Sequence, residues 1–194
     1  MKLRNLSDLL LYELWTLCDA KKQVIAALLR MSRLASNDEL RKELQADADS
    51  AKEHMHVIRT IIGSYQAIPP VKSCAAMRGL IASSELLFNT CIAANNDVLD
   101  AALICASLDI VHQELARLER LRLYAKHLSD WQTVTILHAI LDDVTEAKHR
   151  LAELIDLYVY LDSVSEPESI SIPSDTPPAL SRRPIDWKPL PYFA

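Results

Sequence analysis

Four ionisable residues lie at positions that helical spacing assigns to the inside of a bundle: Lys21, Asp47, His54 and Glu114. Acids and histidines that project inward from facing helices can build a two-metal carboxylate site, because divalent cations need several ligands converging on one cavity. Lys21 does not fit this set, since an ammonium repels metal ions and is costly to bury without an acid. We expect Lys21 to pair with Asp47 or Glu114; the alternative is that it bends to solvent and leaves Asp47 exposed.

Other catalytic arrangements are missing from the sequence. Ser83 and Ser84 have no nearby His and Asp that would activate a nucleophile, and no glycine-rich phosphate loop occurs. The four cysteines lack CxxC spacing, so we expect small, reduced and mostly buried residues rather than a disulfide or zinc framework. They are Cys18, Cys74, Cys91 and Cys105.

Apolar residues that alternate at steps of four and three define the inside of the first two predicted helices. The first helix, residues 6–35, has its seam at Leu10, Leu14, Leu17, Lys21, Val24, Leu28, Met31 and Ala35. The second has its seam at Leu40, Leu44, Asp47, Ala51, His54, Ile58 and Ile61. A Ser36-x-x-Glu39 capping box should open the second helix, and Gly63 should end it as a left-handed cap.

Three further helices are predicted over residues 73–94, 97–128 and 129–162, the last opened by a Ser129-x-x-Gln132 capping box. The chain has only two glycines, and seven of its nine prolines follow residue 166, so the breakers typical of sheet-rich folds are scarce before that point. Four long helices with a shorter one in the third place predict an all-α domain over residues 1–162. Its architecture is a four-helix bundle with an extended crossover.

Residues 163–194 form a proline- and serine-rich tail that we expect to be extended or disordered. Trp187, Tyr192 and Phe193 could dock this tail into a groove of its own bundle, a second subunit or a partner protein. The alternative is a frayed terminus without contacts.

Composition excludes several classes of partner. The net charge is −5 and no basic stripe occurs, which argues against nucleic-acid binding. No run approaches the roughly 18 apolar residues of a membrane span, and the first residues lack the apolar core of a signal peptide. We therefore expect a cytoplasmic protein that binds neither nucleic acid nor membrane.

Four sequence segments resemble the YciF-type branch of the ferritin-like superfamily: LYELWTLCDAKKQVIAAL, DELRKELQADADSAKEHMHVI, CAAMRGLIASSELL and DAALICASLDIVHQELA. The similarity covers about residues 6–157. It implies a bacterial protein with a ferritin-like bundle, a dimeric state, an association with stress responses and a di-metal site of uncertain activity.

The residues at the family's ligand positions depart from that pattern. The resemblance places acidic ligands where this chain has Lys21, Ser50, Ser83, Val111 and Val144. The chain retains the family's ligand residues at His54, His112 and Glu114. Loss of so many carboxylates predicts that no metal cofactor is bound. We expect a homodimeric, non-catalytic structural or protein-interaction module.

Two alternatives remain open at this point. The chain could be a di-iron or di-manganese oxidase or metal-storage protein with a rearranged site built from Asp47, His54, His112, Glu114 and Asp143. The space vacated by the metals could instead form a small-molecule pocket, made apolar by Val111 and Val144.

Overall fold

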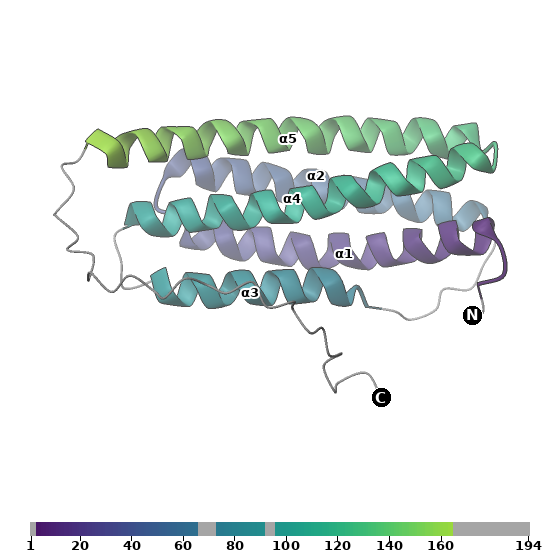
Figure 1. The fold of residues 1–194 in the computed structure, drawn as a ribbon, viewed down its shortest axis with the longest axis horizontal. Coiled ribbons are helices and arrows are strands. Elements are labelled where there is room, and N and C mark those ends of the chain that lie inside the picture. Colours follow the sequence, from purple (N-terminus) through teal and green to yellow (C-terminus); the bar gives the residue numbers. More distant parts are fainter. Residues whose placement is uncertain (1–2, 66–72, 92–95, 165–194) are drawn as a thin grey trace, which may run out of the picture. The chain divides into compact units, whose positions relative to one another are not determined.

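Five helices account for the fold of the described residues (Figure 1). A computed structural model describes residues 3–65, 73–91 and 96–164, with side chains up to residue 155. The helices are α1 (Leu6–Leu34), α2 (Asp38–Ser64), α3 (Ala75–Cys91), α4 (Asn96–His127) and α5 (Trp131–Val164). The described part contains no strand, so the predicted all-α class is confirmed.

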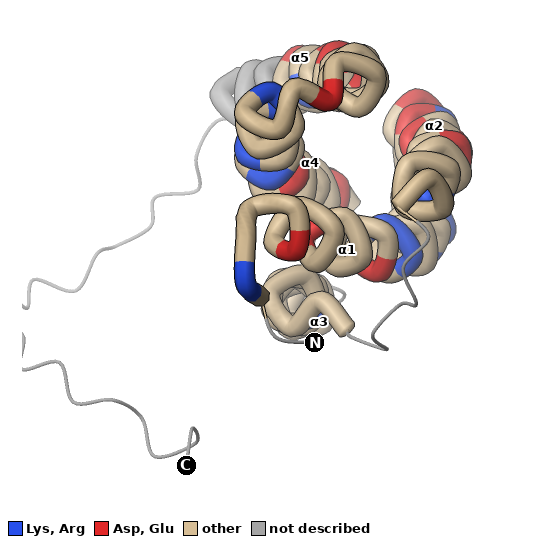
Figure 2. Tube along the Cα trace, turned by 90° about the vertical axis from the view of Figure 1, so that its right-hand side faces the viewer, with Lys and Arg blue, Asp and Glu red and all other residues tan. Residues whose placement is uncertain are grey.

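The four long helices α1, α2, α4 and α5 form the bundle, and α3 lies outside it in the crossover from α2 to α4 (Figure 2). Along the bundle α1 packs on α2 and α4 packs on α5, while α1 also contacts α4 and α2 contacts α5. The short helix α3 packs against α1 and α4. This is the ferritin-like arrangement with a shorter crossover helix that the sequence predicts. No helix in the described part is both long enough and apolar enough to cross a bilayer.

The predicted seams of α1 and α2 face the interior. All eight seam positions of α1 and all seven of α2 are buried, including the three polar residues Lys21, Asp47 and His54. Burial of so many aliphatic side chains, each contributing roughly 1.5 to 3 kcal/mol, drives the long helices together. The four cysteines are free; Cys105 is exposed and the other three are buried, as predicted.

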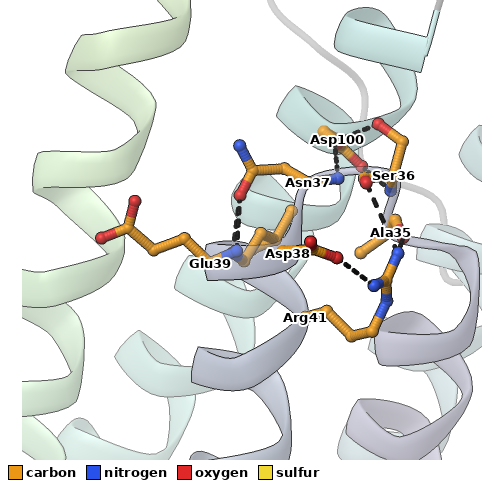
Figure 3. A network of polar contacts seen from close by, with 8 residues as sticks. Ala35, Ser36, Asn37, Asp38, Glu39, Arg41 and Asp100 are labelled. Carbon is orange, nitrogen blue, oxygen red and sulfur yellow. Dashed lines mark hydrogen bonds and ion pairs between the residues drawn. The ribbon is translucent and has the colours of Figure 1, made fainter.

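The start of α2 differs from the predicted capping box by one residue. Asn37 caps the helix, because its Oδ1 accepts the backbone N–H groups of Glu39 at 2.8 Å and Leu40 at 3.0 Å. Ser36 turns toward α4, where its N–H and Oγ donate to the carboxylate of Asp100 at 2.9 and 2.6 Å (Figure 3). The N–H of Asn37 donates to the same carboxylate at 2.9 Å. The fully buried Asp100 thus ties the α1–α2 connection to α4.

The α4–α5 connection is shifted by one residue in the same way. Ser129 has a φ of 57°, in the left-handed region, and the N–H of Asp130 donates to the carbonyl of Ala125 at 3.0 Å. These contacts close α4 in a Schellman arrangement. Asp130 then caps α5, since its Oδ1 accepts the N–H of Thr133 at 3.1 Å. The predicted box of Ser129 and Gln132 is therefore wrong, because Ser129 is used to end the preceding helix.

Three predicted helix ends also change. The expected left-handed cap at Gly63 is wrong, because neither glycine has a positive φ and α2 continues to Ser64. Helix α3 ends at Cys91 instead of residue 94, and residues 92–95 lie outside the described part. Helix α5 runs to Val164, two residues beyond its predicted end.

Candidate functional site

Lys21 lies at the centre of the bundle and is 1% exposed. Its Nζ donates to Oε2 of Glu114 at 2.9 Å, so the seam positions of α1 and α4 carry a buried ion pair. The same Nζ lies 3.3 Å from Nδ1 of His54 on α2. Of the two pairings that the sequence left open, the structure shows the one with Glu114, and Lys21 does not bend to solvent.

His54 continues this contact toward the surface. Its Nε2 lies 3.1 Å from Oδ2 of Asp143 on α5, whose side chain is 64% exposed. Burial, and then the ammonium of Lys21, lower the pKa of His54, while Asp143 opposes the shift. A neutral ring with its proton on Nε2 suits both contacts, because Lys21 then donates to Nδ1 and the ring donates to Asp143.

One residue from each bundle helix therefore takes part in a continuous polar chain from the surface to the core. In order, these are Asp143 from α5, His54 from α2, Lys21 from α1 and Glu114 from α4. Oε1 of Glu114 is buried and has no hydrogen-bond partner among the described residues. The contact of Glu114 with the Lys21 ammonium is therefore made through Oε2.

Asp47 does not contact Lys21; it pairs with Arg150 of α5. Nη2 of Arg150 lies 3.3 Å from Oδ1 of Asp47, and the same guanidinium pairs with Glu43 and, at 3.3 Å, with Glu146. Burial of the carboxyl, followed by repulsion from Glu43, raises the pKa of Asp47 to about 6, although Arg150 acts in the opposite direction. Arg150, Asp47, Glu43 and Glu146 thus form a cluster that holds α2 to α5 beside the polar contacts of Lys21.

Sequence reasoning missed Arg150 as a member of this cluster. It precedes the buried Leu151 and so sits at the edge of the α5 seam. An acid buried at the seam position of Asp47 requires a cation from a facing helix. This requirement is the sequence signal that could have indicated a basic partner for Asp47. The sequence alone does not show which basic residue of α5 faces Asp47.

A cavity of about 40 Å³ adjoins both clusters. Four of the substituted ligand positions line it, namely Lys21, Ser50, Val111 and Val144. The cavity also contacts Asp47, His54, Glu114 and Asp143. Its volume is far below the roughly 300 to 1,000 Å³ of organic ligand pockets and suits water instead, which argues against the small-molecule pocket suggested for this place.

The remaining predicted site residues lie elsewhere. His112 is exposed and its Nδ1 contacts the carbonyl of Leu108 at 2.8 Å, within α4. Ser83 is exposed on α3 and does not line the cavity. Trp187, Tyr192 and Phe193 lie outside the described residues.

The described residues include no group of three or more His, Cys, Asp or Glu side chains placed to hold a metal ion. Two of the carboxylates around the cavity are engaged by cations of the chain itself. Glu114 contacts Lys21, and Asp47 contacts Arg150. The contacts that the structure shows at this site are ion pairs and hydrogen bonds.

Comparisons with known proteins agree with this fold. Protein YciF of Escherichia coli (strain K12) is 26% identical over 156 residues, which cover 79% of this chain and 92% of YciF. The crystal structure of the E. coli stress protein YciF matches with a TM-score of 0.77 at 24% identity, covering 81% of this chain and 99% of that chain.

A second solved structure is YcfI from Rhodopseudomonas palustris. It has a TM-score of 0.73 and 26% identity, covering 77% of this chain and 94% of that chain. These similarities confirm the predicted resemblance to YciF-type proteins. Residues 5–161 match the family described as "Domain of unknown function (DUF892)", and the chain belongs to that family.

Proposed function

We propose that this chain is a non-catalytic member of its family that acts as a structural or protein-interaction module, with an internal ion pair where a di-metal site would lie. The observation that carries this proposal is the 2.9 Å contact between Lys21 and Glu114 in the bundle core, where both residues are at most 3% exposed. A fixed ammonium takes up the negative charge that would attract a divalent cation.

The donor set around the cavity also disfavours a pair of metal ions. Val111 and Val144 supply no ligand atoms, and Arg150 already engages Asp47. Two-metal bundle sites draw carboxylates from all four helices, together with histidines. Here Glu114 is the one carboxylate at the core end of the polar chain.

The descriptions of the relatives are compatible with such a role. E. coli YciF is described as a stress protein, and the R. palustris protein is described provisionally as a structural protein. By this similarity we propose a stress-related, non-catalytic role for the present chain.

Metal analysis of the purified chain tests the proposal. Protein produced with added iron and manganese is desalted, and its bound metal is measured by plasma mass spectrometry. We expect well under one ion per chain. About two ions per chain, the stoichiometry of a two-metal site, would support the rival oxidase or storage function instead.

We propose further that the chain forms a homodimer through the outer face of α3. Leu86 and Leu87 are 70% and 44% exposed on this helix, and exposed apolar side chains favour association. Light scattering should give twice the chain mass, and Leu86→Lys should shift the mass toward that of one chain. Leu123→Lys serves as the control, because Leu123 is a 47% exposed leucine on α4. A wild-type mass of one chain, or equal effects of both variants, would contradict this interface.

Partner binding through the aromatic tail also stays a proposal. Affinity capture with the full chain beside a chain ending at Val164 tests it, because a tail-dependent partner is lost from the shorter chain. Capture of the same partner by both chains would exclude Trp187, Tyr192 and Phe193 as the docking residues.

A further inference from the structure

A hollow of about 280 Å³ lies between α1 and α3, outside the four-helix core. Its apolar lining comes from α1, α3 and α4: Ala27, Met31, Leu34, Ile81, Phe88 and Ile110. All of these side chains except Leu34 are buried. Figure 2 shows α3 lying against the outer side of α1. The lining of this hollow shares Ile110 with the cavity beside Lys21.

The size of the hollow distinguishes it from the cavity in the bundle core. The hollow is about seven times as large as the cavity beside Lys21 and approaches the lower end, about 300 Å³, of organic ligand pockets. Its lining is suited to a hydrocarbon or aromatic group.

The mouth of the hollow is polar. Arg30 of α1 pairs with Glu85 of α3 across the groove, and their side chains are 56% and 44% exposed. A second hollow of about 270 Å³ adjoins the first, because both are lined by Arg30, Ile81 and Glu85. Arg78 also lines the second hollow. The charged lining residues of the two hollows are thus two arginines and one glutamate, with a formal excess of one positive charge.

We propose that the α1–α3 groove binds a small amphipathic monocarboxylate, with its apolar body in the first hollow and its carboxylate at Arg30 and Arg78. The half-exposed Arg30–Glu85 pair contributes little net stability, so an incoming carboxylate can replace Glu85 at low cost. Arginine suits this role because its planar fork binds a carboxylate through two hydrogen bonds. This inference is independent of the proposed function, since it uses no residue of the Lys21 cluster.

Isothermal titration of the full chain with octanoate tests the proposal. Octanol and octylammonium share the chain length of octanoate but carry no charge or a positive charge. We expect octanoate to bind more tightly than either. Octanol binding as tightly as octanoate, or no binding of octanoate, would overturn the proposal.

Variants locate the binding place. Ala27→Leu fills the hollow and should weaken octanoate binding about tenfold or more, and Ser84→Leu provides a second filling variant should the first fail to fold. Arg30→Gln should weaken binding about two- to fivefold, the value of one exposed charge contact. Arg33→Gln, an exposed arginine of α1 that does not line the groove, should leave affinity unchanged. Unchanged affinity in a folded filling variant, or a change of chain mass in place of binding, would assign the groove to another occupant.

Discussion

The Nζ of Lys21 and the Oε2 of Glu114 are 2.9 Å apart, although 93 residues separate them along the chain. Both side chains are at most 5% exposed, so neither charge can be satisfied by bulk water if its partner is removed. This pair, extended through His54 to Asp143, connects all four bundle helices. The first three predictions concern this core and the neighbouring Asp47.

Removing one member of the pair should destabilise the bundle strongly. Lys21→Met and Glu114→Leu each leave an uncompensated buried charge, which typically costs about 3 to 5 kcal/mol of unfolding free energy. The double variant should recover most of this loss, because apolar residues of similar volume replace a buried ion pair at little cost. Urea unfolding of the four proteins measures the coupling energy. Strictly additive losses would mean that the two side chains do not interact.

Asp47 should make the bundle more stable as the solution is acidified toward pH 4. Its pKa is raised from 3.8 to about 6, so the folded chain binds a proton that the unfolded chain releases between these values. The resulting stability is present below pH 3.8 and is lost as the pH rises through 6, amounting to roughly 2 to 3 kcal/mol. Unfolding free energies of wild type and Asp47→Asn from pH 4 to 8 give this contribution as a difference. A difference that does not vary with pH would show that the Asp47 pKa is not raised.

His54 should have the opposite dependence on pH. Its lowered pKa means that the unfolded chain takes up a proton before the folded chain does. The stability from neutral His54 is present above pH 6.5 and decreases as the pH falls through the folded pKa. Relative to His54→Gln, the wild type should lose stability below pH 6.5, and the ring proton shifts of His54 should titrate below that value. His56→Gln, an exposed change two residues away, is the control and should leave the pH profile unaltered.

Asp100 should be required for the α1–α2 connection. Its carboxylate is fully buried and accepts three hydrogen bonds from Ser36 and Asn37. Asp100→Ala should cost about 2 to 4 kcal/mol, because two backbone N–H groups lose a charged acceptor. Amide hydrogen exchange should speed up at both residues. Asp49→Asn, a change of an exposed carboxylate on α2, should alter neither stability nor exchange at the connection by a comparable amount.

The helices themselves were predictable because their signals are local. Seam spacing depends only on residues three or four apart, so all fifteen seam positions of α1 and α2 could be assigned to the interior before any packing was known. The capping residues were harder to predict, since Ser36 and Ser129 also suited the cap by type. Instead, Ser36 donates to Asp100 of α4, and Ser129 belongs to the motif that ends α4. In each case a neighbouring element decides the role of the serine.

The sequence by itself determined that a lysine, an aspartate, a histidine and a glutamate enter the bundle interior. The tertiary structure decided how they pair: Lys21 with Glu114 and His54, and Asp47 with Arg150, 103 residues away. The α1–α3 hollow likewise depends on how the two helices are packed. Such pairings and hollows are set by the rotation and register of one helix against another, which single-helix periodicity does not specify.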